Sequence, residues 1–368
     1  MADTAVVNEA LRLLEALGGV RDRVESELPV LVDLAFPQGD PGFRSGGFLT
    51  RSIIKDGGGD ATVDPVAVAV QGERERALEA GARAVSKLDR SGNAAQLDDE
   101  ETEGLEALIN LTVRPAIRIV DGSFLPPAPP WEDLEQFRDG IEKIARSVGR
   151  VQVTGNPLLP FAGTGSVVAP GVVMTNRHVA KVFASREGDN WVFDPGVTAG
   201  LDWADDPDAA GDDTGDTQFT VTKVIGVHPK FDLALLGVES PAGATAPEPV
   251  RLASESMDPL ERRRIFVVGY PALDPRNGAE AMRRIFGDVY NVKRLQPGEI
   301  MIVPPDLGIF HHDCSTLGGN SGSCVIDLDS NLVLGLHFAG KYLKSNKAVA
   351  LWQLKDDPML TAAGVNFD

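Results

Sequence analysis

Near its C-terminus the chain carries the stretch Leu317-Gly318-Gly319-Asn320-Ser321-Gly322-Ser323, followed by the apolar pair Val325-Ile326. A serine between glycines is typical of a nucleophile on a tight turn between strands, because glycine lacks the Cβ atom that would block such a turn. If Ser321 attacks a carbonyl group, the backbone N–H groups of Gly319 and Ser321 are placed to bind the developing oxyanion. The alternative is a Gly/Ser loop without chemistry. The stretch is not a G-x-S-x-G elbow, since residue 323 is serine.

A nucleophilic serine needs a general base and a group that orients this base. Among the five histidines of the chain, His178 follows two strand-like segments joined by the turn signal Pro170-Gly171. Asp232 is a lone carboxylate at the start of the apolar run 233–236, where composition disfavours an acid. His178, Asp232 and Ser321 occur in this order, each at a strand end or a turn. We therefore expect them to form a His-Asp-Ser catalytic triad.

From about residue 148 to the C-terminus, the sequence resembles the trypsin-like serine proteases of the chymotrypsin fold. The residues that carry the resemblance are Gly163-Thr164-Gly165, Thr175-Asn176-Arg177-His178-Val179, Phe231-Asp232-Leu233-Ala234-Leu235-Leu236 and Gly318-Gly319-Asn320-Ser321-Gly322-Ser323. The resemblance implies a double β-barrel that hydrolyses peptide bonds through an acyl-enzyme. The Gly-Asn-Ser-Gly form is similar to the HtrA-type and glutamyl endopeptidase branches. Digestive members have an aspartate that pairs with a freed N-terminus, and Asn320 cannot form that ion pair.

The resemblance also bears on specificity. In glutamyl endopeptidases, a threonine shortly before the nucleophile and a histidine on the following strand line the pocket for an acidic side chain. Thr316 and His337 stand at comparable places in this chain. These two residues are therefore expected to hold a glutamate carboxylate by charge-assisted hydrogen bonds. The alternative is a strand histidine that bonds only to the backbone, and we assign His228, His311 and His312 to structure or surface.

The 368-residue chain has room for two domains. Helical patterns recur at 6–35, 73–88 and 98–112. We expect a mostly α-helical region over 1–120, a Pro-rich linker with a helix over 121–147, and the protease domain over 148–368. The fold class is thus mainly β, with a chymotrypsin-like double β-barrel behind a helical region. This region is either a regulatory domain that docks a protein partner or a structural collar on the protease.

Composition limits the partners. A net charge of −19 at neutral pH disfavours nucleic acid and anionic membranes, which would repel this surface. The N-terminus lacks a basic region followed by a long apolar run, and no segment reaches the roughly 18 apolar residues that span a bilayer. We therefore expect a cytoplasmic protein that acts on a protein or peptide substrate, with no nucleic-acid or membrane partner.

Two further features bear on cofactors. Cys314 and Cys324 bracket the nucleophile, and they are either free thiols in a reducing cytosol or bridged in a secreted protease. Their spacing is not that of a zinc site. The acidic insert 202–216 is either a solvated loop or a calcium site, although its spacing is not that of an EF-hand. We expect no metal and no cofactor.

The sequence thus predicts a serine endopeptidase. A catalytically silent binding or signalling module on a protease scaffold is the alternative, and it would be expected to have lost one member of the triad. All three members are present here.

Overall fold

A computed structural model of the chain describes residues 80–81, 83–88, 90–91, 95–102, 105, 114–156, 161–206, 218–273, 279–341 and 345–368. The chain divides into two compact units. The barrel unit comprises Pro115–Leu273, Val289–Lys341 and Ser345–Asp368, and the N-terminal unit takes its described residues from Met1–Arg114 and Asp274–Asp288. No helix formed by the described residues combines the length and the apolar character that crossing a membrane requires.

In the N-terminal unit, the described residues between 80 and 105 are largely helical. Asp98 and Glu101 form a capping box, in which the Glu101 N–H donates to Asp98 Oδ1 (2.8 Å) and the Asp98 N–H donates to Glu101 Oε2 (3.1 Å). A small apolar cluster contains Ala84, Leu88, Leu97 and Leu105. The unit also contains α7 (Ala279–Phe286). The helical pattern at 6–35 lies outside the described residues, so the helical character expected of region 1–120 stays a prediction.

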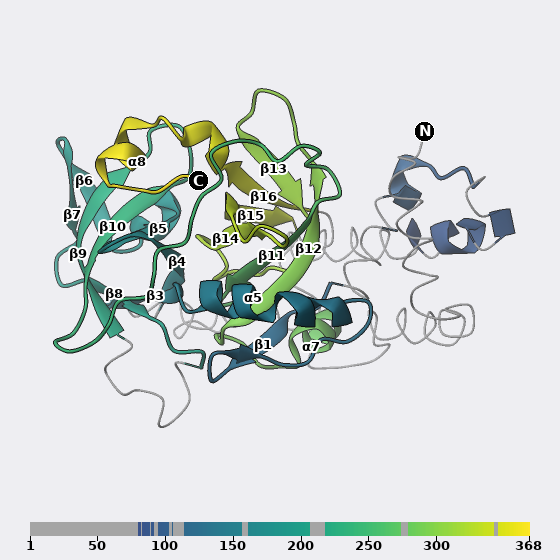
Figure 1. Ribbon diagram of the computed structural model, residues 1–368, viewed down its shortest axis with the longest axis horizontal. Coiled ribbons are helices and arrows are strands. Elements are labelled where there is room, and N and C mark those ends of the chain that lie inside the picture. The colour runs from purple at the N-terminus through teal and green to yellow at the C-terminus, as the bar shows by residue number, and fades with distance from the viewer. Residues whose placement is uncertain are drawn as a thin grey trace, which may run out of the picture. The chain divides into compact units, whose positions relative to one another are not determined.

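The first barrel closes in the order β10-β5-β4-β3-β8-β9. Its strands are β3 (Val148–Thr154), β4 (Phe161–Ala169), β5 (Val172–Thr175), β8 (Thr198–Asp202), β9 (Gln218–Val227) and β10 (Ala234–Glu239). All neighbouring pairs are antiparallel. A short helix, α6 (Arg177–Ala180), follows β5, and a hairpin of β6 (Ala184–Glu187) and β7 (Asn190–Phe193) follows this helix. These elements are teal in Figure 1.

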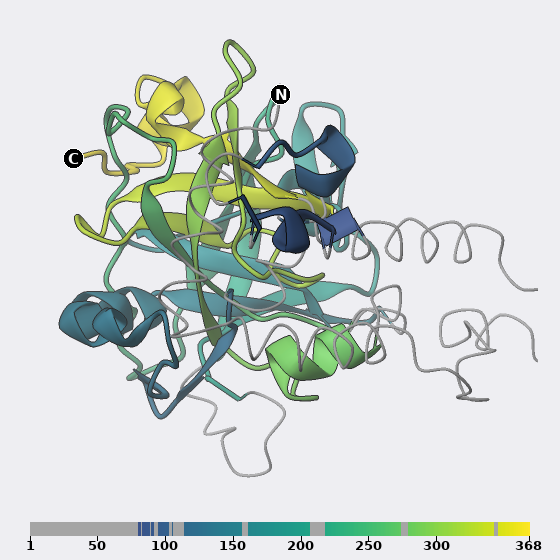
Figure 2. The same ribbon diagram turned by 90° about the vertical axis from the view of Figure 1, so that its right-hand side faces the viewer.

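The second barrel runs in the order β11-β14-β15-β16-β13-β12 and closes because β11 also pairs with β12. Its strands are β11 (Arg264–Gly269), β12 (Arg294–Ile302), β13 (Ile309–His312), β14 (Cys324–Asp327), β15 (Val333–Lys341) and β16 (Ser345–Ala350). The chain ends with η4 (Leu351–Leu354) and α8 (Pro358–Ala362), and Figure 2 shows α8 beside the C-terminus. The expected mainly β class with a double barrel is confirmed.

The apolar runs of the sequence become strands that are buried on both faces. Because successive side chains of a strand point to opposite faces, Ala234 and Leu236 of β10 pack inside the first barrel, whereas Leu235 packs into a cluster shared with the second barrel. In β11, Val267 lies in the core of the second barrel and Phe266 in the shared cluster. The shared cluster therefore holds the two barrels together.

Residues 115–147 pack as part of the barrel unit. The strand β1 (Ile117–Val120) pairs with β12 and with β2 (Ser123–Phe124), which extends the sheet of the second barrel. The helices η3 (Glu132–Phe137) and α5 (Arg138–Ala145) follow.

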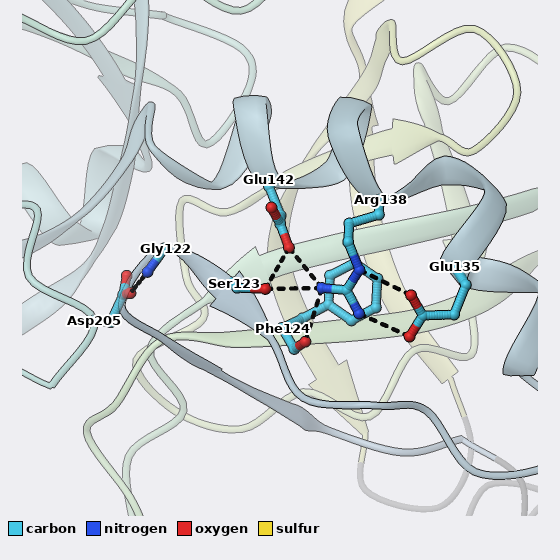
Figure 3. Close-up of polar contacts among 7 residues, drawn as sticks. All are labelled: Gly122, Ser123, Phe124, Glu135, Arg138, Glu142 and Asp205. Carbon is cyan, nitrogen blue, oxygen red and sulfur yellow. Dashed lines mark hydrogen bonds and ion pairs between the residues drawn. The ribbon is translucent and has the colours of Figure 1, made fainter.

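Arg138 joins these elements, as Figure 3 shows. Its guanidinium donates to both carboxylate oxygens of Glu135 (2.7 and 2.8 Å) and to Glu142 Oε1 (2.6 Å). It also donates to Ser123 Oγ (2.8 Å) and to the Phe124 carbonyl (3.0 Å), and it lies 3.8 Å from the centroid of the Phe124 ring. The arginine thus ties the helices to the β1–β2 hairpin.

Candidate active site

His178 and Asp232 meet because their strands are neighbours. The end of β5 pairs with the start of β10, with Thr175 opposite Ala234, so the residues just beyond these strand ends lie side by side. His178 Nδ1 is 2.6 Å from Asp232 Oδ2, and the His178 N–H donates to Asp232 Oδ1 (3.0 Å). Asn176 Nδ2 donates to the Asp232 carbonyl (2.8 Å). Both carboxylate oxygens therefore hold the histidine.

The surroundings of Asp232 keep it ionised. Burial raises the pKa of its carboxyl group, but the hydrogen bonds and charge of His178, together with the charge of Arg177, outweigh burial and bring the pKa below its usual range. A carboxylate is an acceptor only, so His178 Nδ1 carries the proton that bonds to it. Whenever the ring carries a single proton, Nε2 is thus its basic nitrogen, and the side chain of His178 is 46% exposed.

The loop that carries Asp232 is fastened to the C-terminal helix. His228 Nδ1 accepts from the backbone N–H groups of Lys230 (3.2 Å) and Phe231 (2.9 Å). Its Nε2 is 3.2 Å from Asp357 Oδ2, and Asp357 also caps the N-terminus of α8. This buried histidine, which the sequence assigned only to structure or surface, shapes the loop that ends at Asp232.

The turn around Ser321 depends on two glycines with positive φ. Gly319 (φ 89°) and Gly322 (φ 90°) both adopt a conformation that other residues rarely hold. A Cβ on Gly319 would lie 2.3 Å from the Tyr270 carbonyl oxygen, and one on Gly322 would lie 2.1 Å from the Thr164 carbonyl oxygen. Two hydrogen bonds close the turn, from Asn320 N–H to the Leu317 carbonyl (3.1 Å) and from Ser323 N–H to the Asn320 carbonyl (2.9 Å).

Two of the unused backbone donors of the turn lie on either side of Asn320. Neither the Gly319 N–H nor the Ser321 N–H donates to any residue that the structure describes. These are the two groups that the sequence placed at the oxyanion. Free, fixed N–H groups next to a nucleophile are what stabilisation of a developing oxyanion requires.

The first barrel approaches the Ser321 turn through Gly163 and Thr164. The Thr164 N–H donates to the Ser321 carbonyl (2.8 Å). A Cβ on Gly163 would lie 2.6 Å from the Ser321 carbonyl oxygen and 2.8 Å from Val179 Cγ2. Since Val179 follows His178 in α6, the bare backbone of Gly163 lets the serine turn lie next to the helix that carries His178.

Known proteins share the sequence pattern of this region. A family model described as a trypsin-like peptidase domain matches residues 163–336, the segment that contains all three expected triad residues. The chain carries a trypsin-like peptidase domain. It is accordingly a serine peptidase.

Relatives of this peptidase are distant. A curated protein of Lysobacter enzymogenes, described as a probable serine protease, is 27% identical over 334 residues, which cover 80% of this chain and 83% of that protein. Among solved structures, the Rv3671c protease of M. tuberculosis in its active form is 21% identical, with a TM-score of 0.41, and the match covers 66% of this chain and 89% of that one. A serine endoprotease of Yersinia pestis is 12% identical, with a TM-score of 0.40, over 62% of this chain and 67% of that one.

In the peptidase, β15 runs beside the serine turn and brings His337 close to it. The Gly322 N–H donates to the His337 carbonyl (3.0 Å), and the His337 N–H donates to the Ser323 carbonyl (2.8 Å). His337 Nδ1 lies 3.2 Å from Nε2 of His312, which is fully buried. Burial, followed by the charges of His312 and His178, holds the pKa of His337 well below its usual value, so its ring is neutral.

Thr316 lies near the C-terminal end of β15, close to Gly340. Its hydroxyl donates to Asn346 Oδ1 (2.7 Å), and Asn346 Nδ2 donates to the Cys314 carbonyl (2.6 Å). A Cβ on Gly340 of β15 would lie 3.7 Å from Thr316 Oγ1. No hydrogen bond joins Thr316 and His337 within the described part of the chain. The sequence gave no site role to Asn346, which accepts the hydrogen bond of the Thr316 hydroxyl, or to His312, whose ring nitrogen lies against that of His337.

The remaining candidates have structural partners. Cys314 and Cys324 are buried in different apolar clusters and are not joined by a disulfide, and burial raises the pKa of Cys324 to about 11. In the acidic insert, Asp205 accepts from the Gly122 N–H (2.6 Å) and pairs with the buried Lys293 (3.0 Å). The described residues contain no group of three or more His, Cys, Asp or Glu that could hold a metal ion, and residues 207–217 lie outside them.

Proposed function

We propose that the peptidase is an endopeptidase in which Ser321 is the nucleophile, His178 the general base and Asp232 the group that orients the base. The observation that carries this proposal is the grip of both Asp232 oxygens on His178, next to a serine turn with two unused N–H groups. The three residues divide the work as in the serine protease triad.

In the proposed reaction, Ser321 Oγ attacks the scissile carbonyl carbon and its proton passes to His178 Nε2. The carbonyl oxygen becomes an oxyanion that accepts hydrogen bonds from the Gly319 and Ser321 N–H groups. The C–N bond then breaks, and His178 gives its proton to the leaving amine. Water attacks the acyl-enzyme in the same way and releases the carboxylic acid and free Ser321.

The test is to label the full chain with a fluorophosphonate beside Ser321→Ala and Asp232→Asn. We expect the label to be absent from Ser321→Ala, and kcat of Asp232→Asn to fall by about 10⁴-fold, because the wrong imidazole tautomer then faces the serine. Retained peptidase activity in Ser321→Ala would refute the triad. A wild-type chain that neither labels nor cleaves any peptide would favour the silent binding module.

The proposed preference is for glutamate or aspartate before the cut. His337 is adjacent to the Ser321 turn, and its neutral ring has one nitrogen directed at His312 Nε2. One of these two nitrogens must donate to the other. If His312 donates, the proton of His337 is on Nε2, where it is able to donate to a substrate carboxylate.

A panel of peptides that differ only before the cut tests this preference. His337→Gln is expected to lower kcat/KM for glutamyl peptides by more than 10-fold, since one charge-assisted hydrogen bond contributes about 1.5–3 kcal/mol. Thr316→Val removes the second expected contact. Equal losses for glutamyl and leucyl peptides in both variants would exclude an acidic pocket.

We also propose that the N-terminal unit regulates the peptidase through a protein partner. Two observations support this: it is a separate compact unit, and it includes the insert 274–288, which follows directly on the residues that support the serine turn. Removal of residues 1–114 is expected to raise the labelling rate of Ser321. An unchanged rate would favour a structural collar.

A further inference from the structure

Thr164 is buried at the point where the first barrel meets the serine turn, and it has no part in the triad or in the expected pocket. Its hydroxyl donates to the Gly319 carbonyl (2.7 Å) and accepts from the Tyr270 N–H (3.3 Å). Its backbone N–H donates to the Ser321 carbonyl (2.8 Å). One residue of β4 thus contacts the backbone on both sides of Asn320 as well as the segment after β11.

The segment after β11 holds the next carbonyl of the turn. The Ala272 N–H donates to the Gly318 carbonyl (2.6 Å). In a planar trans peptide the C=O and the N–H point in opposite directions. The bond from Ala272 therefore turns the Gly319 N–H away from Ala272 and leaves it available for the oxyanion of the proposed reaction.

Within the turn itself, no side chain restrains rotation of the backbone at Gly318 and Gly319. Gly318 and Gly319 have no side chains, and glycine tolerates both signs of φ. The direction of the Gly319 N–H consequently depends on the hydrogen bonds that hold the two adjacent carbonyls. Ala272 holds the Gly318 carbonyl, and the Thr164 hydroxyl holds the Gly319 carbonyl.

We propose that the Thr164 hydroxyl is a positioning group for the oxyanion hole. It fixes the Gly319 carbonyl directly, and through the Tyr270 N–H it fixes the segment whose Ala272 N–H holds the Gly318 carbonyl. A hydroxyl is suited to this because it donates one hydrogen bond and accepts another at the same atom. The β-branch of threonine also restricts rotation about χ1. This inference rests on the proposed role of the Gly319 N–H in binding the oxyanion.

A positioning role has a kinetic signature that a purely structural role lacks. A donor that is misdirected binds the substrate as before but binds the charged transition state less well, so kcat falls while KM stays the same. Loss of one oxyanion donor lowers kcat by about 10²–10³-fold. Because Thr164 acts on the donor through other groups, we expect a loss of about 10- to 100-fold in kcat for the variant without the hydroxyl.

The experiment compares three variants of the full chain with the wild type. Thr164→Val keeps the shape and removes the hydroxyl, and Thr164→Ser keeps the hydroxyl. Ser166→Ala is the matched control, since it removes another buried hydroxyl of β4, whose neighbour is the Cys324 thiol of β14 and not a carbonyl of Gly318 or Gly319. If Thr164→Val does not fold, Thr164→Ala, which only removes atoms, replaces it.

Each variant is measured for kcat and KM on one peptide substrate, and for the affinity of a peptidyl boronic acid and of the corresponding peptide amide. The boronic acid forms a tetrahedral adduct that uses the oxyanion hole, whereas the amide binds as a ground state. For Thr164→Val we expect kcat and boronate affinity to fall by similar factors, with KM and amide affinity unchanged, and Thr164→Ser to recover most of the loss.

The inference is overturned if Thr164→Val behaves like Ser166→Ala, if only KM changes, or if Thr164→Ser is as impaired as Thr164→Val. These outcomes are separate from a failure of the proposed triad. That failure would appear as activity that survives Ser321→Ala, whatever the Thr164 variants do.

Discussion

The sharpest prediction concerns residues 115–147, which the sequence places mostly in a linker and the fold places in the barrel unit. We compare two fragments, 115–368 and 148–368. Both lack residues 1–114, so their difference reports on 115–147 alone. The shorter fragment loses β1, which pairs with β12, and the clamp made by Arg138.

The size of the effect follows from the buried side chains. Seven large apolar residues of this segment lie in the cluster shared by the two barrels: Ile117, Ile119, Phe124, Trp131, Leu134, Ile141 and Ile144. Full burial of such a side chain contributes about 1.5–3 kcal/mol, so together they contribute on the order of 10 kcal/mol or more. The total stability of a domain is typically about 5–15 kcal/mol. We therefore expect 148–368 not to fold cooperatively.

Circular dichroism during thermal unfolding measures this difference, and fluorophosphonate labelling of Ser321 reports whether the site is formed. The expected result is a cooperative transition and labelling for 115–368, and neither for 148–368. If 148–368 unfolds cooperatively within a few degrees of 115–368 and labels at the same rate, the segment is an appendage and the reasoning from its burial is wrong.

Three further predictions concern single residues. Arg263→Met removes the guanidinium that donates to both oxygens of the fully buried Asp327 (2.5 and 3.2 Å). The free energy of unfolding, measured in urea, should therefore fall by about 3–5 kcal/mol. A loss below about 1 kcal/mol would contradict this. Burial lowers the pKa of His312 to about 3, so as pH falls from 6.5 the unfolded state takes up a proton that the folded state does not. Stability should then decline by about 1.4 kcal/mol per pH unit from this group, and His312→Gln should flatten the urea-measured slope between pH 6.5 and 4. Gly322→Ala should abolish peptide cleavage, because its Cβ would lie 2.1 Å from the Thr164 carbonyl oxygen. The control is Gly188→Ala, at a position with positive φ but with open space around it. This variant should lose only about 1–2 kcal/mol of unfolding free energy and remain active.

Some features of the site are local, and local features were predictable. Positive φ at Gly319 and Gly322 is required by the turn itself, so the glycines are visible as a pattern around Ser321. The apolar runs before and after the expected site residues predict strands because strands buried on both faces show no polar alternation. Asp232 is conspicuous because it stands directly before such a run. These signals were sufficient to predict strands and the three triad candidates, whereas the double barrel was expected from the resemblance to trypsin-like serine proteases that the same residues carry.

Other features depend on contacts between residues far apart in the chain. The pairing of β1 with β12 joins Ile117 to Leu295, and no local pattern near Ile117 indicates that partner. The sequence assigned His312 only to structure or surface, and its contact with His337 depends on which strands lie beside β15 and β16.

The sequence by itself therefore determined the nucleophile turn and the candidates for the triad, since turn conformation and strand burial are properties of short segments, and the motifs around these residues carried the family resemblance that implied the fold class. Only the tertiary structure decided how the turn is supported. The Thr164 hydroxyl and the Ala272 N–H reach the carbonyls of Gly319 and Gly318 from other strands. The tertiary structure likewise decided the packing of residues 115–147, because a strand or a helix selects its partner by shape and burial across the whole chain.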